Sequence, residues 1–406
     1  MKPIGFVDQL TRSYVTGWAA NEEDLTSPVT VAIFIDGRGC GTVRADRFRQ
    51  GLSTLWPGAT GKYEFHFYFP RALSLYHRHE VSIKVVGSDH SLTGANGQIR
   101  GLSTFVIEAI NHGTDVEQYR PHGPVLVSTL GRSGSTALMR TLSQHPDIIV
   151  AGERPFEVEM ACYYAYALYV LLSEGDYERS LRPDLITAVS DRYQIGFNPY
   201  FEPSVGKIFK DQNLLHDFLN TQVPRRLIPA FRAIILDYYE AVAKDQQKKG
   251  STYFAEKVLP EQDARFGIRA MFPNTKEIVL VRDARDAMCS FMASGGLTFA
   301  EARSNAESAA LRYLEIQQEE NLQTHFVRYE DYVLDQANVM GRVLDFLELS
   351  GEATDDLDAM SNLFQVHGTS VSPEASIGRW RRDLSSEQLS QLDGLTEFLV
   401  KFGYDT

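Results

Sequence analysis

Residues 125–146 read VLVSTLGRSGSTALMRTLSQHP. The aliphatic and β-branched run Val125–Thr129 predicts a buried strand, and the apolar residues Leu138, Met139 and Leu142 recur at helical spacing. A turn rich in glycine and serine separates the strand from the helix. Such a turn presents several backbone N–H groups to an anion, and the helix dipole adds to the attraction. The stretch therefore predicts an anion-binding turn within an α/β sheet.

The same kind of pattern continues to the C-terminus. From Pro124 onward, short β-branched runs alternate with long helical stretches, which is typical of a parallel sheet covered on both faces. The further strands are expected at Ile148–Ala151, Tyr253–Glu256, Glu277–Val281 and His325–Arg328. The helices are expected at Ala137–Gln144, Phe156–Ser173, Leu227–Gln247, Phe299–Gln323, Asp335–Leu349 and Ser385–Lys401. These elements predict an α/β domain with a P-loop-like parallel sheet.

The first hundred residues carry a different pattern. Val29–Asp36 ends in Asp36-Gly37, a hairpin-turn signal, and Cys40–Ala45 is expected to return as the partner strand. Tyr63–Phe69 and Glu80–Val86 alternate in the manner of half-buried strands. Short strands at this spacing, with Gly, Asp and Pro between them, predict a small antiparallel β-sandwich.

A polar stretch that contains Gly and Pro separates the two patterns and is expected to be a linker. We therefore predict a β-sandwich accessory domain over residues 1–107, a linker over 108–123 and the α/β domain over 124–406. The motifs Gly5-Phe6-Val7-Asp8 and Gly17-Trp18-Ala19 resemble a β-sandwich module of bacterial glycosyltransferases and related sugar-modifying enzymes. The alternative is a structural or oligomerising module that binds no ligand.

Composition narrows the class of protein. The chain has 53 Asp+Glu against 40 Lys+Arg, and its formal net charge of −13 arises entirely after residue 120. An acidic chain disfavours nucleic acid as a partner, because that binding depends on neutralising phosphates. The three cysteines lack metal-ligand spacing, no signal peptide is visible, and the longest apolar stretch, Ala161–Leu172, is too short to span a bilayer. We expect a cytoplasmic protein with no transmembrane segment.

Charged and polar residues follow the other predicted strands. Glu153, Lys257, Arg282 and Tyr329 each stand at or just after a strand end, and ligands of open parallel sheets bind beyond these ends. The turn itself is not a Walker A motif, since Ser135 stands where its lysine would be. Convergence on one sheet edge favours an anion site. The alternative is that the charges, including those of Arg282-Asp283-Ala284-Arg285-Asp286, form surface ion pairs.

Four motifs in order resemble those of sulfotransferases that use PAPS (3′-phosphoadenosine 5′-phosphosulfate). Arg132-Ser133-Gly134-Ser135-Thr136, continuing to His145-Pro146, is similar to the 5′-phosphosulfate loop of the tyrosylprotein branch and of many bacterial members. Arg282 with Ser290 eight residues later matches the 3′-phosphate signature. Val327–Asp331 and Ile377–Trp380 match further family segments.

The resemblance implies roles for these residues. The loop would hold the 5′-phosphosulfate through backbone N–H groups and hydroxyls, with Arg132 as its fixed positive charge. Arg282 and Ser290 would bind the 3′-phosphate. The implied cofactor is PAPS, its product is adenosine 3′,5′-bisphosphate (PAP), and no metal is expected. The cofactor-binding residues would be Arg132, Ser133, Gly134, Ser135, Thr136, Arg282, Ser290, Tyr329, Ser370 and Arg379.

The resemblance also implies a general base and a group that stabilises the leaving oxygen. Glu153 lies where the tyrosylprotein branch keeps its catalytic Glu, and Glu157 is the rival. An acid here is otherwise expected in the first turn of the following helix. Lys257 matches the family lysine at the bridging oxygen, which makes Glu153, Lys257 and Arg132 the implied catalytic set. His145 before Pro146 indicates a helix stop rather than a base.

The acceptor is the least constrained part of the prediction. Ser294 stands where the tyrosylprotein branch has an Arg, which argues for a relative rather than a true tyrosylprotein enzyme. The sandwich resemblance favours a hydroxyl on a sugar, glycan or glycolipid over a peptide or small-molecule acceptor. Acceptor binding is expected in the aromatic-rich insert 163–236, and the alternative is that its apolar and aromatic residues form core. A nucleotide-dependent kinase and a non-catalytic glycan- or partner-binding protein remain alternatives. The sequence predicts no oligomeric state.

Overall fold

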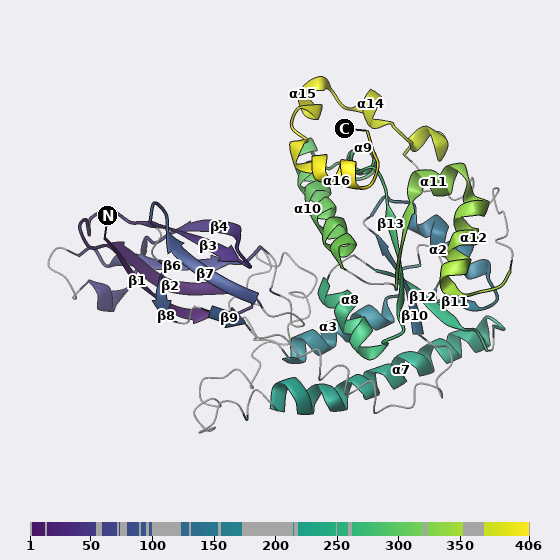
Figure 1. Cartoon of the computed structure of the whole chain (residues 1–406), viewed down its shortest axis with the longest axis horizontal. Helices are drawn as coiled ribbons and strands as arrows, with labels where there is room; N and C mark the ends of the chain where they lie inside the picture. Colours follow the sequence, from purple (N-terminus) through teal and green to yellow (C-terminus); the bar gives the residue numbers. More distant parts are fainter. Residues whose placement is uncertain are drawn as a thin grey trace. The chain divides into compact units, whose positions relative to one another are not determined.

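The computed structural model divides the chain into two units (Figure 1). The first unit contains residues 1–113 and 165–228, and the second contains residues 114–164 and 229–406. The predicted domain bounds stay a prediction, because most of the expected linker lies outside the described residues. The described residues are 2–12, 14–53, 59–70, 73, 79–88, 91–94, 97–99, 123–129, 131–152, 156–172, 214, 218–248, 250–258, 262–319, 323–351 and 369–405.

The first unit contains two β-sheets that pack through a shared core. Val7, Val15 and Phe65 of one sheet are buried together with Val31 and Ile83 of the other. This arrangement confirms the predicted small sandwich, although one pair of strands, β1 and β8, is parallel. The first sheet has the order β5 (Arg47–Phe48), β6 (Lys62–Tyr68), β2 (Tyr14–Asn21), β1 (Pro3–Leu10) and β8 (Thr93–Gly94). The second has the order β4 (Arg38–Arg44), β3 (Thr30–Ile35), β7 (His79–Val85) and β9 (Gly97–Ile99).

The predicted hairpin turn connects β3 and β4. Ile35 pairs with Arg38, so only Asp36 and Gly37 form the loop, and both have positive φ, 51° and 77°. Positive φ at both central residues defines the type I′ turn that matches strand twist, which is why Asp-Gly occupies it. The Asp36 carboxylate also accepts a hydrogen bond of 2.8 Å from the backbone N–H of Glu80 on β7. The turn thereby fixes three neighbouring strands.

The second unit is built on a five-stranded parallel sheet. Its order is β11 (Ile148–Val150), β12 (Tyr253–Val258), β10 (Gly123–Thr129), β13 (Lys276–Val281) and β14 (Thr324–Arg328). Of these five strands, β10 comes first in the sequence and is central in the sheet, and the later strands lie on both sides of it. Such a reversal of strand order opens a crevice at the carboxyl ends of the strands. The five predicted strands and the parallel α/β fold are confirmed.

Helices cover both faces of this sheet, and Figure 1 shows α10 and α12 on opposite sides of it. Ile278 and Leu280 of β13 pack in the cluster of α2 and α12, whereas Val279 and Val281 pack in the cluster of α9 and α10. This alternation explains why the run Ile278–Val281 of the strand is continuously apolar. The helices are α2 (Ser135–Gln144), α3 (Met160–Leu172), α7 (Val223–Asp245), α8 (Gln262–Met271), α9 (Ala284–Gly295), α10 (Phe299–Gln318), α11 (Tyr329–Leu334) and α12 (Gln336–Leu347). Of these, α8, α9 and α11 were not predicted.

The prediction of one terminal helix over Ser385–Lys401 is wrong. The chain instead forms α14 (Trp380–Asp383), α15 (Ser386–Leu389), a 3₁₀ turn at Asp393–Leu395 and α16 (Thr396–Lys401). Asp393 and Gly394, both poor helix formers, stand at the break. The helix over Phe299–Gln323 likewise ends earlier than predicted, at Gln318.

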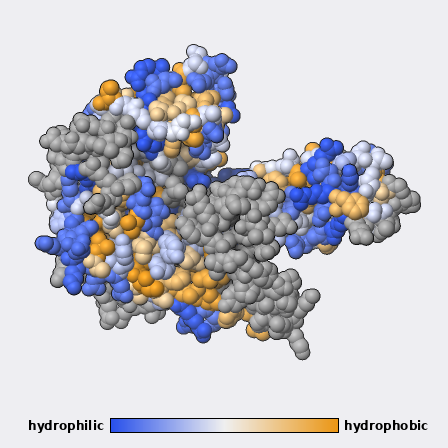
Figure 2. All heavy atoms as spheres, turned by 180° about the vertical axis from the view of Figure 1, so that it is seen from behind, coloured by the Kyte–Doolittle hydropathy of each residue, from blue (hydrophilic) through white to orange (hydrophobic). Residues whose placement is uncertain are grey.

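Within the described ranges, no helix is long and apolar enough to cross a membrane. Exposed large apolar side chains such as Phe48, Leu334 and Val371 are dispersed along the chain. Figure 2 shows hydrophobic residues interspersed with hydrophilic ones on the face that it presents.

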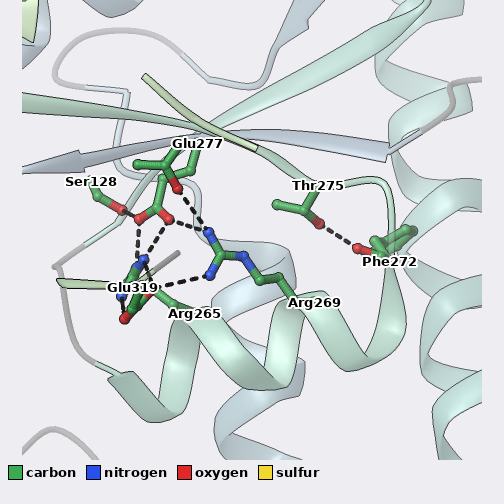
Figure 3. Close-up of polar contacts among 8 residues, drawn as sticks. Ser128, Arg265, Arg269, Phe272, Thr275, Glu277 and Glu319 are labelled. Atoms are coloured by element: carbon green, nitrogen blue, oxygen red, sulfur yellow. Dashed lines mark hydrogen bonds and ion pairs between the residues drawn. The ribbon is translucent and has the colours of Figure 1, made fainter. Parts of the chain in front are cut away.

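A fully buried carboxylate, that of Glu277 on β13, ties several elements of the second unit together (Figure 3). It accepts hydrogen bonds from Arg265 Nε (2.6 Å) and Nη2 (2.7 Å) of α8 and from Arg269 Nη2 (2.6 Å). Ser128 Oγ of β10 donates a fourth at 2.5 Å. Glu319, after α10, accepts from Arg265 Nη1 at 2.8 Å. Burial acts to raise the pKa of Glu277, but Arg265, Arg269 and Ser128 outweigh it and lower this pKa.

We expect Glu277→Gln to lower the free energy of unfolding by about 3–5 kcal/mol, because it removes the buried counter-charge of Arg265 and Arg269 and leaves them only the partly exposed Glu319. Urea denaturation at pH 7 measures the change. A lowered folded-state pKa stabilises the fold above the unfolded-state value, and this stabilisation is lost as the pH falls through the folded-state pKa. The difference in the free energy of unfolding between wild type and variant should therefore become smaller below about pH 4.

The matched control is Glu348→Gln, because Glu348 pairs with Lys276 at 2.7 Å but its side chain is 83% exposed. Exposed pairs contribute little, so we expect no measurable change in unfolding. An equal decrease in the free energy of unfolding in both variants would contradict the role of Glu277. A difference between wild type and Glu277→Gln that does not vary with pH would contradict it as well.

Candidate functional site

The turn between β10 and α2 has the backbone conformation of an anion-binding loop. Arg132 and Gly134 both have positive φ, 67° and 84°, and Gly134 is the N-cap of α2 without a side-chain cap hydrogen bond. A Cβ on Gly134 would lie 2.5 Å from two carbons of the Tyr329 ring, so only glycine fits. The first N–H groups of α2 are thus left uncapped by the preceding side chain, at the positive end of the helix dipole.

Two arginines interlock beside this turn. Arg282 Nη1 donates to the carbonyl oxygen of Arg132 at 2.7 Å, and its Nη2 donates to the carbonyl oxygen of Ser376 at 2.9 Å. Its guanidinium lies 4.5 Å from the centroid of the Tyr329 ring. The Nε of Arg282 is buried and has no hydrogen-bond partner among the described residues. Arg282 thus fixes the turn and keeps one buried donor unmatched.

Hydroxyl groups connect Arg132 to a third arginine. Arg132 Nε donates to Ser290 Oγ at 3.0 Å, and Ser290 Oγ lies 3.0 Å from Thr369 Oγ1. Arg379 Nη1 donates to Thr369 Oγ1 at 2.7 Å and to Ser370 Oγ at 3.1 Å. The structure therefore joins the turn, α9 and the C-terminal segment into one polar cluster.

The electrostatics of this cluster favour a negatively charged ligand. Burial lowers the pKa of Arg132, and the positive charges of Arg282 and Arg379 lower it further. Arg379 pairs with Asp383 at 2.7 Å, whereas the hydrogen bonds of Arg282 go to carbonyl oxygens. An anion placed among the three guanidiniums would offset their mutual repulsion.

The C-terminal segment is held against the sheet by Asp286 of α9. Asp286 Oδ2 accepts from the backbone N–H of Gly378 at 2.6 Å, and its Oδ1 accepts from that of Trp380 at 2.9 Å. The Trp380 ring lies between the guanidiniums of Arg285 (3.8 Å) and Arg381 (4.4 Å). Asp286 is 1% exposed, and its burial raises its pKa. These contacts set the position of Arg379.

A lysine and a glutamate meet at the end of β12. Lys257 Nζ donates to Glu157 Oε1 at 2.8 Å, and the side chain of Lys257 is 12% exposed. The preceding residue, Glu256, is fully buried and accepts hydrogen bonds from Ala161 N (2.9 Å) and Tyr239 Oη (2.5 Å). Burial raises the pKa of Glu256 to about 7. Glu256 thus anchors the start of α3 next to Lys257.

The structure brings most of the predicted site residues together. Glu153 lies outside the described residues, and His145 follows the last residue of α2, at the opposite end of that helix from the turn. The alternative of surface ion pairs for 282–286 is wrong, because Arg282, Asp283, Arg285 and Asp286 are buried. The predicted residues joined in the polar cluster are Arg132, Gly134, Arg282, Ser290, Tyr329, Ser370 and Arg379.

Several residues of the site were not predicted. Thr369 stands beside the predicted Ser370 in the polar run Gly368-Thr369-Ser370, which was the available signal. Asp286 was visible only as one charge in an alternating run, and nothing local indicated that it receives two backbone N–H groups. Within the described residues, no group of three His, Cys, Asp or Glu side chains is arranged to hold a metal ion.

Fold and site together define an α/β domain with a cluster of three arginines at the carboxyl edge of a parallel sheet. Residues 124–353, more than half of the chain, match the sulfotransferase family. The chain belongs to this family and is a sulfotransferase, an enzyme that transfers a sulfuryl group; the family generally uses PAPS. No curated protein matches the chain.

Solved sulfotransferase structures resemble the chain at low identity. The sulfotransferase domain from the curacin biosynthetic pathway is 18% identical, covers 70% of this chain and 98% of its own, and has a TM-score of 0.41. A sulfotransferase from Mycobacterium avium is 15% identical over 74% of this chain and 82% of its own, with a TM-score of 0.36. Mouse sulfotransferase SULT7A1 complexed with PAP is 14% identical over 39% of this chain and 70% of its own, with a TM-score of 0.27.

We expect Gly134→Ala to destabilise the protein by about 1–3 kcal/mol, because the residue must keep positive φ while its methyl group meets the Tyr329 ring. Gly341→Ala is the matched control, since Gly341 lies inside α12 and a Cβ there meets nothing within 4 Å. This control should be stabilising by about 0.5–1 kcal/mol. Thermal unfolding of both variants measures the difference, and changes of the same sign would contradict the role of Gly134.

Proposed function

We propose that this enzyme transfers a sulfuryl group from PAPS to a hydroxyl acceptor on a sugar, glycan or glycolipid, by in-line displacement with a glutamate as base. The observation that carries the proposal is the cluster of Arg132, Arg282 and Arg379 around an uncapped helix N-terminus. The buried, unmatched Nε of Arg282 fits a ligand with an anionic group close to the turn. PAPS, when bound, supplies the sulfuryl group and the bisphosphate leaving group.

The residues of the turn bind and orient the 5′-phosphosulfate end in this proposal. Backbone N–H groups and hydroxyls of Ser133–Thr136 donate to its oxygens, and Arg132 adds a fixed positive charge. The partly closed environment strengthens these interactions, since Ser133 and Ser135 are both buried. Positioning and charge stabilisation of this kind carry most of the catalysis in related phosphoryl transfers.

The 3′-phosphate end belongs to the cluster at α9. Arg282 and Ser290 lie within one hydrogen-bonded group with Arg132. Thr369 adds a hydroxyl to the predicted set, and Asp286 holds the segment that carries Arg379. A ligand with phosphates at both ends of a ribose would span the turn and this cluster. Discrimination between PAPS and ATP would follow, because ATP has no 3′-phosphate.

Glu153 is the proposed base and Lys257 the proposed partner of the leaving oxygen. As the acceptor oxygen bonds to sulfur, its proton passes to Glu153, the bond from sulfur to the bridging oxygen breaks, and Lys257 stabilises the charge left on that oxygen. Glu157 is the alternative base. Its 2.8 Å ion pair with Lys257 supports a different role for it, since a glutamate that took up the proton would lose the negative charge that this pair depends on.

Two further parts of the proposal concern the whole chain. We propose residues 1–107 as a β-sandwich accessory domain for glycan acceptors, followed by a linker over 108–123 and the catalytic domain over 124–406. A cytoplasmic location agrees with Cys40, Cys162 and Cys289, none of which forms a disulfide.

Calorimetric titration with PAP and with ADP, each with and without magnesium, tests the cofactor. We expect PAP to bind without magnesium and more tightly than ADP. Arg282→Ala should weaken PAP at least tenfold through loss of a charged hydrogen-bond donor, while the control Arg303→Ala, which removes a half-buried arginine of α10 outside the polar cluster, should not. Equal or tighter binding of ADP would exclude a PAPS enzyme and favour the kinase alternative.

Paired variants decide between the two candidate bases. We expect Glu153→Gln to lower turnover by about 100-fold or more while leaving PAP affinity unchanged, as loss of a general base does. Glu157→Gln should retain most of the turnover. Sulfate transfer to a panel of sugar acceptors, measured for both variants beside wild type, provides the rates. Full activity in Glu153→Gln together with loss in Glu157→Gln would reverse the assignment.

A further inference from the structure

A cavity, separate from the polar cluster of the turn, lies at the edge strand β14. Its volume is about 270 Å³, and its lining includes residues of β14, α11, α12 and α16. Within the described part of the chain, β14 ends the sheet, because β13 is its only paired neighbour. Figure 1 shows α12 and α16 on opposite sides of the sheet, so the cavity extends around the strand edge between them. Neither the family match nor the proposed reaction assigns it a ligand.

Positive charge dominates the lining. Arg328, Arg342 and Lys401 line the cavity with a single acid, Asp331. None of these three cations forms an ion pair within the described ranges, and Arg342 Nη1 donates instead to the neutral amide oxygen of Asn338 at 2.9 Å. Elsewhere in the same unit, cations such as Arg265 and Arg285 are matched by carboxylates. In a chain of net charge −13, a cavity with this balance is a local site for an anion.

Arg328 is fixed in a geometry that suits recognition of an oxyanion. Its guanidinium lies 4.5 Å from the centroid of the Tyr404 ring, and Tyr404 Oη in turn donates to Glu330 at 2.9 Å. The Nε of Arg328 is buried without a hydrogen-bond partner among the described residues. A planar guanidinium held against a ring loses little further freedom when it binds, and its donors match the spacing of phosphate oxygens.

A histidine of the cavity, His325, lies close to the positive charge of Arg342. His325, which also lines the cavity, stacks on the Phe346 ring at 5.2 Å. Burial lowers the pKa of His325, and the charge of Arg342 lowers it further. A neutral imidazole still offers one N–H donor to a ligand.

We propose that this cavity binds a small molecule carrying a phosphate group, through Arg328, Arg342 and Lys401. The volume lies just below that of ordinary ligand pockets, which suits a compact phosphate ester rather than a larger compound. The site is distinct from that of the turn although adjacent residues serve both: Arg328 lines the cavity, while the ring of Tyr329 lies beside Arg282.

Titration with pyrophosphate in a chloride buffer tests the site on the full chain. The titration is made in an Arg132→Gln background, which weakens the anion-binding turn. The double variant Arg342→Gln/Lys401→Gln removes two exposed charges from α12 and α16, and in this background we expect it to weaken pyrophosphate binding at least tenfold. The charge-matched control Arg225→Gln/Arg226→Gln, on the exposed surface of α7, should bind in this background as Arg132→Gln alone does. Thermal unfolding confirms that each variant is folded.

Arg132→Gln separates this site from the anion-binding turn and makes the test independent of the proposed PAPS reaction. Pyrophosphate binding that persists in Arg132→Gln and is lost when Arg342→Gln/Lys401→Gln is added to it supports the proposal. Binding that is lost in Arg132→Gln alone, equal affinity of Arg132→Gln with and without the double variant, or no binding to wild type would overturn it. Citrate serves as a comparison of similar charge, and citrate binding as tight as pyrophosphate would overturn the assignment to phosphate.

Discussion

The buried carboxylate of Glu277 is the constraint on which the site depends. It links β13 to β10 through Ser128, and these are the two strands that lead into Arg282 and the anion-binding turn. Its pairs with Arg265 and Arg269 bring α8 into the same unit. A buried ion network stabilises little compared with an apolar core of the same volume, but it penalises every arrangement in which one member is left unpaired. The network therefore favours a single register of the two strands, and with it one spacing between Arg132 and Arg282.

The site departs from the rules that the rest of the domain follows, as functional sites do. Arg132 has positive φ without being glycine, and Arg282 keeps a buried Nε unmatched among the described residues. Three guanidiniums lie close enough for two of them to lower the pKa of the third. Such an arrangement is costly without a ligand, and its cost is offset by the packing of the Glu277 network and by the cradle that Asp286 forms for Gly378 and Trp380.

The parallel sheet could be predicted from the sequence because its strands contain short apolar runs, several of them buried on both faces, as Ile278–Val281 is. Because ligands of parallel sheets bind beyond the carboxyl ends of the strands, the sequence also predicted Arg282, Lys257 and Tyr329 as site residues. The roles of Thr369, Asp286 and Glu256 could not be predicted, since each acts through partners far along the chain. Glu256, for example, accepts a hydrogen bond from the backbone N–H of Ala161. The terminal helix was predicted wrongly because apolar spacing outweighed the weak helix propensity of Asp393-Gly394.

Net charge is a poor guide to where an anion binds in this protein. Several acidic residues of the second unit form ion pairs with its own arginines. Glu277 and Glu319 pair with Arg265 and Arg269, and Asp283 pairs with Arg285. Pairing of this kind cancels charge in the interior and on the helices, but it leaves Arg282 bonded to carbonyl oxygens, which carry no countercharge. A ligand at the sheet edge experiences the charges nearest to it rather than the total of −13, because more distant surface charges are screened within about 8–10 Å by salt. An acidic protein can for this reason hold a polyanionic ligand, provided that its acids are bound to its own arginines elsewhere.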